Sequence, residues 1–461
     1  MTTPTAEAST VISPGSPARP RPTRRALDEL SLPVDAAWLA AASQGDPDWL
    51  VADRTAAFEA WAALPGESNL LYTPYIDLRA ASLDAARLAE RPVAVAAPDL
   101  PADADGLIEI REARTVGVAL SPAAAAAGVR LAPLDGSVTQ ATFEGAAPLP
   151  DRDKFAQLTR ALWTAGVVLD VPAGVRLEHP IVIRWAVGAP DRAIVTRTLV
   201  HLGAGAEAAI VEELVASDEA VDGGGQAYVA GTTEVTLEAG ATLRAASLQE
   251  SPANVIAVQH RVSAIGEGAS LQWALAQLGG RLVRSRVDNR LEGDRSSVEQ
   301  VEIVFGSDEQ LFDLTSYTTH VGRDTTGDLL SKGALLDRAR SYMKGLITIE
   351  KSAIGTDSFL GEFGMNLSKA ARSVAIPSLE IDQPDCRRAA HSSSVGPIDE
   401  TQLFYLESRG IPPDEARKFI VLGFLEPVVA RVPLASAQAR LRELLEDKWA
   451  AGVGGGLGTA A

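Results

Sequence analysis

The residues with the clearest chemical potential are Cys386 and His391, which lie five positions apart in "PDCRRAAHSSSVG" (384–396). A thiol and an imidazole this close suggest a nucleophile with its base, two metal ligands, or two unrelated side chains. Arg387 and Arg388 could lower the pKa of the thiol, but they could equally be solvated loop charges. No Asn or Asp that would orient such a pair is identifiable. From these residues alone, incidental roles are favoured for both Cys386 and His391.

A second group of polar residues lies in "QLFDLTSYTTHVGRDTTGD" (310–328) and comprises Asp313, His320, Asp324 and Asp328. Carboxylates grouped on one strand face would suit a carbohydrate-active enzyme, but acidic residues are abundant throughout this chain. A polysaccharide-active enzyme is therefore an alternative that rests on fold analogy alone. The motifs of P-loop nucleotide binding, G-x-S-x-G hydrolases and H-E-x-x-H metalloproteases are absent from the sequence.

Composition limits the compartment and the partners. The chain has 42 Lys and Arg against 60 Asp and Glu, which gives a net charge of −18. Such a charge repels phosphate backbones and anionic lipids, so we expect no nucleic-acid partner. No window holds the ~18 consecutive apolar residues of a membrane span, so no membrane is expected. The single cysteine excludes an internal disulfide and a self-sufficient thiolate site for a metal, and it favours the cytoplasm.

The elements that must position these residues change character along the chain. From about residue 167 to 382, short alternating Val, Leu and Ala runs are separated by turns. Their second or only glycines are Gly174, Gly205, Gly240, Gly268 and Gly293, at intervals of 31, 35, 28 and 25 residues. A glycine permits φ > 0 at a corner, and the alternation buries one face against the next coil. The pattern predicts a parallel β-helix rather than an antiparallel β-sandwich, because none of these five turns carries an Asn-Gly or Asp-Gly hairpin signal.

The predicted fold is therefore mainly β, with a parallel β-helix core between two helical domains. "DRDKFAQLTRALWTAG" (151–166) is expected to be one helix before the core, and Asp399 is expected to cap a helix that closes at Gly410 after it. The predicted segments are a disordered leader (1–25), an N-terminal helical and mixed domain (26–165), the β-helix (166–390), a C-terminal helical domain (391–451) and a disordered tail (452–461).

Several stretches resemble the SufB/SufD family, which builds iron–sulfur clusters as part of the Suf system. Its carboxy-terminal signature is similar to "IPSLEI" (376–381), then a short loop with "HSSSVG" (391–396), then "IDETQLFYLESRGIPPDEARKFIVLGF" (398–424). Residues 320–359 resemble the strand region of the family, and "DPDWLVADRTAAFEAW" (46–61) resembles its helical opening. The resemblance covers most of the chain from about residue 26, and the "LFYLESRGI" block is its most specific part.

The resemblance implies a right-handed parallel β-helix with helical terminal domains. Because the chain has one cysteine, it is more like SufD than SufB. The implied role is a non-enzymatic scaffold that pairs with SufB through the β-helices and with the SufC ATPase through the C-terminal helices. A SufB-like homodimer is the alternative within the family. No cofactor is expected to be permanently bound, and an iron–sulfur cluster would form transiently at the interface with SufB.

By position, the resemblance assigns His391 to the nascent cluster, as a ligand or an essential neighbour. Imidazole is a sensible iron ligand beside thiolates from another chain. SufD chains often carry a cysteine two residues before this histidine, where this chain has Ala389, and this departure argues against a metal role for Cys386. In the C-terminal helical region, the residues expected to bind a partner are Phe404, Tyr405, Arg409 and Gly410.

Overall fold

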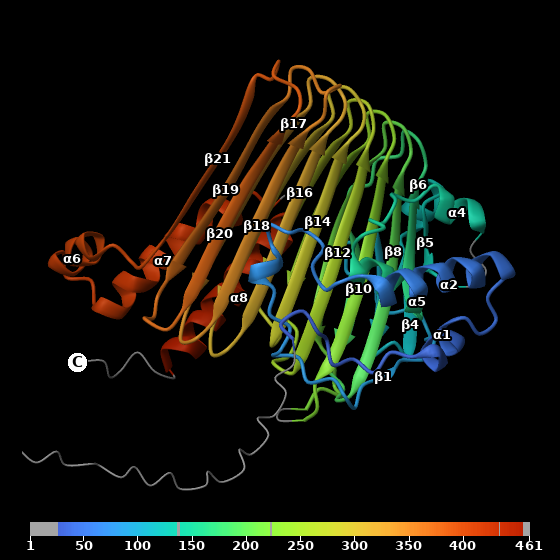
Figure 1. Ribbon diagram of the computed structural model, residues 1–461, viewed down its shortest axis with the longest axis horizontal. Coiled ribbons are helices and arrows are strands. Elements are labelled where there is room, and N and C mark those ends of the chain that lie inside the picture. The colour runs from blue at the N-terminus through green and yellow to red at the C-terminus, as the bar shows by residue number, and fades with distance from the viewer. Residues whose placement is uncertain (1–25, 136–138, 222–223, 433, 455–461) are drawn as a thin grey trace, which may run out of the picture.

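The protein is built around a solenoid of two facing β-sheets (Figure 1). The computed structural model describes residues 26–135, 139–221, 224–432 and 434–454, so the predicted leader (1–25) lies outside the described residues. Sheet 1 has the strand order β5-β6-β8-β10-β12-β14-β16-β18-β20, with β1 beside β8. Sheet 2 has the order β2-β4-β3-β7-β9-β11-β13-β15-β17-β19-β21.

From β6 onward, successive strands alternate between the two sheets, and all their pairings with one another are parallel. β6 pairs antiparallel with β5 on its other side. The strands are β6 (Ala165–Val171), β7 (Ile181–Val187), β8 (Arg192–Leu202), β9 (Glu207–Ala216), β10 (Ala227–Leu237), β11 (Thr242–Gln249), β12 (Val255–Ile265), β13 (Ser270–Gln277), β14 (Leu282–Leu291), β15 (Ser297–Gly306), β16 (Leu311–His320), β17 (Thr326–Leu335), β18 (Arg340–Ile349), β19 (Asp357–Asn366), β20 (Arg372–Ile381) and β21 (Arg388–Gly396). They are preceded by β1 (Arg87–Leu88), β2 (Val93–Ala94), β3 (Gly106–Arg111), β4 (Thr115–Leu120) and β5 (Arg130–Pro133). The prediction of a parallel β-helix is confirmed.

The spacing of the turn glycines follows the coil length. Partners in register on adjacent coils are Ala165 with Thr196, Ala193 with Tyr228, Ala227 with Val255 and Ile256 with Leu282. These pairs are 31, 35, 28 and 26 residues apart in sequence. The intervals between the turn glycines, 31, 35, 28 and 25 residues, are nearly the same. Each turn therefore occupies the same corner of its coil.

A positive φ at this corner is confirmed for four of the five glycines, and the fifth differs. The φ angles are between 62° and 72° at Gly174, Gly205, Gly240 and Gly268. In the next turn Arg295 adopts the left-handed conformation instead, with φ of 59°. Gly293 is required there for a different reason, because a Cβ on it would lie 2.0 Å from the backbone nitrogen of Glu267 in the neighbouring coil.

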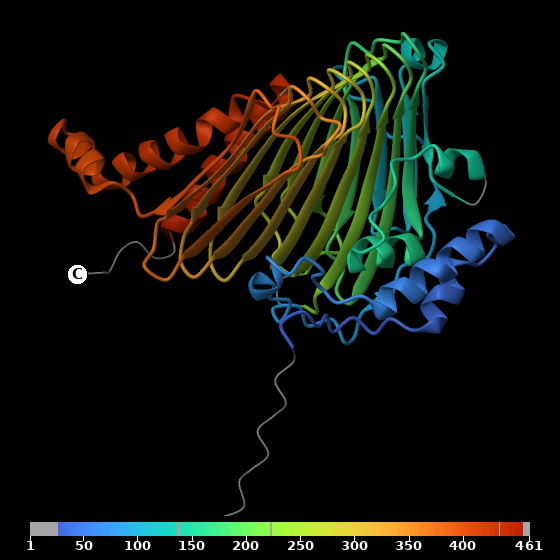
Figure 2. The same cartoon turned by 45° about the horizontal axis from the view of Figure 1, so that its top comes forward.

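The N-terminal helices lie on the outer face of sheet 1 (Figure 2). α5 (Lys154–Leu162) packs directly on β8, β10 and β12, while α1 (Ala36–Ala42) and α2 (Asp48–Ala63) pack on α5. We call these helices and residues 64–86 the N-terminal cover. The helix predicted over 151–166 is shorter than expected, because Asp153 caps α5 and β6 already begins at Ala165. Short helical turns are η1 (Thr73–Tyr75), α3 (Pro122–Ala126) and α4 (Gln140–Glu144).

The C-terminal helices lie on the opposite face of the solenoid, against sheet 2 (Figure 2). α7 (Pro413–Val429) packs on β15 and β17, and α8 (Ala435–Gly454) packs on β11. Outward residues such as Val301, Ile303 and Phe305 of β15 are buried beneath these helices. α6 (Glu400–Ser408) contacts α7 and projects beyond the last coil (Figure 1).

Three predicted boundaries fall inside regular elements, and the one between residues 165 and 166 lies one residue inside β6. Residues 391–396 were expected in a loop at the start of the C-terminal helical domain, but they form most of β21, the last strand of the solenoid. α8 continues to Gly454, so the first residues of the predicted tail (452–461) are helical, and those after 454 lie outside the described residues. Within the described ranges, no helix has the length and apolar character needed to cross a membrane.

Candidate functional site

The solenoid ends in two strands that are paired on one side only. β20 is bonded to β18, and β21 is bonded to β19, and no described strand adjoins either one on its outer side. Most residues of β21 are exposed to solvent. We call these two strands the open end (Figure 1). Their unpaired backbone N–H and C=O groups make them a template for a further strand or another chain.

His391 lies on the inner face of the open end. Its partner in register is Leu360 of β19, which is buried inside the solenoid, and partners in register on parallel strands point to the same face. No coil covers β21 among the described residues, so the imidazole of His391 is exposed. Within the same residues, no group of three or more His, Cys, Asp and Glu is arranged to hold a metal ion. His391 can therefore offer one ligand to an iron whose other ligands come from elsewhere.

Cys386 lies in the turn between β20 and β21 and is half-buried against the inner cluster that contains Leu360. The guanidinium groups of Arg387 and Arg388 pair with carboxylates, Asp324 at 2.5 Å and Asp357 at 2.7 Å. The structure shows no hydrogen bond between Cys386 and His391 within the described chain, and only His391 is on the exposed strand. The two residues therefore do not form a Cys–His pair.

His320, considered above for carbohydrate chemistry, is a core residue. It is fully buried inside the solenoid, where its partners in register, Leu291 and Ile349, are also buried. Its ring nitrogens lie 2.8 Å from the Thr325 hydroxyl and 3.0 Å from the Ser358 hydroxyl. Burial lowers the pKa of His320 to about 4, so the ring is neutral at physiological pH.

The three carboxylates considered with His320 lie in different parts of the molecule. Asp313 is buried on the outer face of sheet 1, Asp324 occupies a corner with φ of 54°, and Asp328 pairs with Arg431 of the C-terminal segment at 3.2 Å. The structure therefore does not bring these carboxylates together, and the geometry gives no support to a polysaccharide-active enzyme.

Exposed aromatic side chains occupy the C-terminal helices α6 and α7. Phe404 and Tyr405 of α6 are 70% and 56% exposed, and Phe419 of α7 is 56% exposed. The guanidinium of Arg409 lies 5.1 Å from the centre of the Tyr405 ring. Gly410 follows with φ of 88° and ends the helix, which confirms the predicted closing residue. Large apolar groups that remain exposed side by side are typical of a protein-binding surface.

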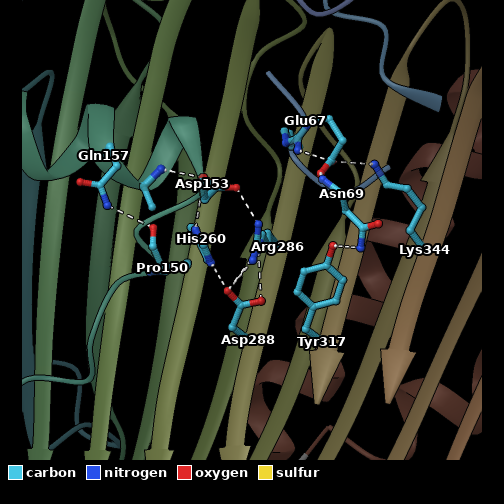
Figure 3. Close-up of polar contacts among 12 residues, drawn as sticks. Glu67, Asn69, Pro150, Asp153, Gln157, His260, Arg286, Asp288, Tyr317 and Lys344 are labelled. Carbon is cyan, nitrogen blue, oxygen red and sulfur yellow. Dashed lines mark hydrogen bonds and ion pairs between the residues drawn. The ribbon is translucent and has the colours of Figure 1, made fainter. Parts of the chain in front are cut away.

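Sequence reasoning missed a group of buried charges beneath the N-terminal cover (Figure 3). Asp153, the cap of α5, accepts a 2.7 Å hydrogen bond from Arg286 of β14. Asp288 of the same strand lies 2.7 Å from Nε2 of His260. Nδ1 of His260 is 3.8 Å from Asp153, which is an ion-pair distance but too long for a hydrogen bond. Burial opposes ionisation of Asp153, but Arg286 and His260 outweigh it and hold the pKa of this carboxyl well below its usual range.

A second set of buried charges ties Glu67 of the cover to three strands of sheet 1. Figure 3 shows two members of this set, Glu67 and Lys344. Arg284 donates to Glu67 at 2.9 Å and to Asp313 at 3.1 Å. Lys344 lies 2.5 Å from Asp313 and 3.9 Å from Glu67. All four side chains are almost completely buried. Two positive and two negative charges thus compensate each other in a buried site.

The sequence shows that β14 carries charged residues at alternating positions, although it does not show what these side chains contact. β14 reads "LVRSRVDNRL", in which Arg284, Arg286, Asp288 and Arg290 alternate with inward residues. Charges at every second position predict a polar outer face. Only the structure shows that the cover buries Arg284, partly buries Arg286 and Asp288, and leaves Arg290 exposed.

The environment of His260 predicts a pH dependence of stability. Burial opposes the charge on His260, but Asp288 and Asp153 outweigh it and raise the pKa of the ring. A raised pKa means that the stabilisation is complete below the unfolded value of about 6.5 and is lost as the pH rises through the folded value. We therefore expect the difference in free energy of unfolding between wild type and His260→Gln to shrink above about pH 6.5. Denaturant titrations of both proteins over that range would measure it, and a constant difference would contradict the charged pairing.

Comparison with known proteins identifies the family of the chain. Residues 185–424 match the family model described as SUF system FeS cluster assembly, SufBD core domain. The chain is 29% identical over 299 residues to the iron-sulfur cluster assembly protein SufD of Bacillus subtilis, which is 65% of this chain and 67% of that protein. It is 30% identical over 245 residues to a SufBD family protein of Mycobacterium tuberculosis, which is 52% of this chain and 62% of that one. For a SufBD family protein of Staphylococcus epidermidis, the identity is 27% over 295 residues, with 64% and 62% covered.

Proposed function

Because the chain belongs to the SufBD family of the SUF system for iron–sulfur cluster assembly, we propose that it is a non-catalytic, SufD-like scaffold subunit. In this role it pairs with SufB at the open end and binds the SufC ATPase through its C-terminal helices, in the cytoplasm. The cluster is cargo that forms transiently at the interface with SufB. No cofactor is held permanently.

The observation that carries the proposal is the position of His391. An exposed imidazole on the inner face of the last strand can reach a group bound by a partner that docks on the unpaired edge. Edge strands pair readily with other chains, and a partner there would enclose His391 from the uncovered side. Iron accepts imidazole together with thiolates, and this chain has one cysteine to offer. The missing thiolates then come from SufB.

The SufD-like assignment rests on the cysteine count and on its placement. Cys386, the single cysteine, is half-buried in the turn before β21 and packs on apolar side chains. A chain that built clusters alone would need further sulfur ligands. Two copies of this chain together would supply only two thiols. A SufB-like homodimer is the second candidate, favoured by the unpaired edge that each copy would present to the other.

Co-expression with SufB and SufC, followed by size-exclusion chromatography and iron analysis, tests the proposal. We expect the three chains to elute together and to acquire iron and sulfide under anaerobic conditions. Elution of this chain apart from both partners would contradict the proposed role. Anaerobic iron and sulfide loading of the chain alone separates the two candidates, since the homodimer would form a cluster and the SufD-like subunit would not.

The exposed aromatics predict where the ATPase binds. Replacement of Phe404 or Tyr405 with alanine is expected to weaken SufC binding by about 10-fold or more, as for aromatic anchors of other interfaces. Folding should be unaffected, because both side chains are largely exposed. Leu70→Ala is the matched control, because Leu70 is 85% exposed but lies in the N-terminal cover. Calorimetric titration of SufC measures the effect, and equal losses in all three variants would refute this docking surface.

A further inference from the structure

A groove lies where the N-terminal cover meets the corners of the solenoid that precede β14, β16 and β18. Its volume is about 570 Å³, which is within the range of sites that bind small molecules. The charged residues that line it are Asp77, Arg79, Arg281, Glu309, Arg338 and Arg340, and we call it the arginine groove. Four arginines against two carboxylates make this groove a local exception in a chain whose net charge is −18.

The arginines of the groove come from both of its sides. Arg340, the first residue of β18, is in register with Leu311 of β16. Leu311 is buried in the cluster beneath the cover, so the side chain of Arg340 leaves the same outer face of sheet 1. Arg281 and Arg338 belong to the corners just before β14 and β18, and Arg79 belongs to the cover. The fold therefore brings together guanidinium groups that are far apart in the sequence.

Two carboxylates hold three of the four guanidinium groups in place. Asp77 accepts two hydrogen bonds from Arg79, both of 2.8 Å. Glu309 accepts a 3.0 Å hydrogen bond from Arg281 and also pairs with Arg338. These contacts position the arginines, and they occupy both carboxylates that line the groove.

Arg340 is the arginine that these carboxylates leave over. Within the described ranges, its guanidinium makes no hydrogen bond and no ion pair, although it is close enough to influence Asp77. The hydrogen bond from Arg79 lowers the pKa of Asp77 against the effect of burial, and the charge of Arg340 acts in the same direction. The corner carboxylates Asp308 and Asp337 do not line the groove, and Asp337 accepts the N–H of Asp308 at 2.9 Å. The groove thus has an excess of two positive charges.

We propose that the arginine groove binds a small molecule that carries a phosphate group. A phosphate monoester has a charge of about −1.5 to −2 at pH 7, which matches the excess of two positive charges. Guanidinium groups bind phosphate oxygens through paired hydrogen bonds, and Arg340 has its donors free for this purpose. A volume of about 570 Å³ also leaves room for an organic part of the ligand beside its phosphate.

The charge of the rest of the protein selects for a small ligand. A net charge of −18 repels long polyanions such as nucleic acids, whereas a small anion meets only the positive groove. None of the residues that line the groove belongs to β20 or β21. The inference therefore does not rest on the proposed role of the open end in cluster assembly.

Calorimetric titration of the full-length chain with inorganic phosphate and with inorganic pyrophosphate tests the proposal, at low ionic strength and about pH 8, where phosphate groups are dianionic. We expect saturable binding of one anion per chain, tighter for pyrophosphate because it carries more charge. Arg340→Gln should weaken both affinities by about 10-fold or more. Arg340→Lys, which keeps the charge but not the paired donors, should lose less. Because Arg340 is exposed and unpaired, circular dichroism should show an unchanged fold in both variants.

A second variant is expected to act in the opposite direction. Glu309→Gln should tighten binding by about 2- to 5-fold, because Arg281 and Arg338 lose the carboxylate that competes with the anion. Arg290→Gln and Glu292→Gln are the matched controls. These residues pair with each other at 3.1 Å outside the groove, are similarly exposed, and change the net charge by the same amounts. Both controls should bind phosphate and pyrophosphate like wild type.

Three results would overturn the proposal. The first is a lack of saturable binding of either anion up to about 10 mM, well above millimolar dissociation constants. The second is an equal loss in Arg340→Gln and Arg290→Gln, which would mean that binding follows the net charge alone. The third is binding that neither Arg340→Gln nor Glu309→Gln alters, which would place the anion elsewhere. Each of them leaves the scaffold role intact, because co-elution with SufB and SufC is measured separately.

Discussion

Replacing His391 with alanine is expected to lower the cluster-bound iron of the complex with SufB and SufC by about 10-fold or more, the effect expected when a metal site loses a ligand or its direct support. The complex itself should still assemble. His391 is exposed and has no hydrogen-bond partner among the described residues, so its loss opens no cavity and breaks no contact in the free chain. The free energy of unfolding should therefore change by no more than about 0.5 kcal/mol.

Two controls make this prediction specific to the imidazole. Ser392→Ala changes the neighbouring residue, which is in register with Gly361 and faces the other side of β21. Cys386→Ser removes the thiol from the turn before the strand. Both variants should retain iron close to wild type, measured by iron and sulfide content of the anaerobically purified complex. Full iron content in His391→Ala, or a large loss in Cys386→Ser, would show that the cluster is bound elsewhere.

The resemblance of the sequence suggests a role for His391, which stays a proposal, but the place of this residue in the fold could not be predicted. The serines of "HSSSVG" and the following Pro397 have the composition of a loop, and a loop was expected. The structure makes the same residues a strand because β19 offers its edge and pairs with residues 388–396. Pairing between coils is long-range, and local composition does not record it.

The solenoid itself was predictable because its signal repeats. Corner glycines, alternating small apolar residues and coil-length spacing all describe one unit, so each coil supports the prediction for the next. At the corner that contains Arg295, a residue other than glycine has the positive φ angle. The glycine pattern therefore fails there although the solenoid continues. What covers the outer faces is not part of the repeat, and the buried charges under the N-terminal cover were missed for that reason.

The second large effect concerns those buried charges. Arg284→Met is expected to reduce the free energy of unfolding by about 3–5 kcal/mol, the range for removing one partner from a buried ion pair. Methionine fills much of the volume, but Glu67 and Asp313 are then left with Lys344 as their single cation. Two carboxylates and one ammonium then leave a net negative charge in a buried site. Denaturant unfolding followed by circular dichroism would measure the loss.

Arg290→Met is the matched control, because Arg290 lies on the same strand and the same face as Arg284. It pairs with Glu292 at 3.1 Å and with Glu350 at 3.5 Å, but these side chains are between 40% and 49% exposed. Exposed pairs contribute about 0–1 kcal/mol, so this variant should unfold almost like wild type. Adding Glu67→Gln to Arg284→Met should recover part of the loss, since it removes the uncompensated charge. Equal losses in the two methionine variants would mean that the cover does not exclude water from Arg284, and that apolar packing alone holds it on sheet 1.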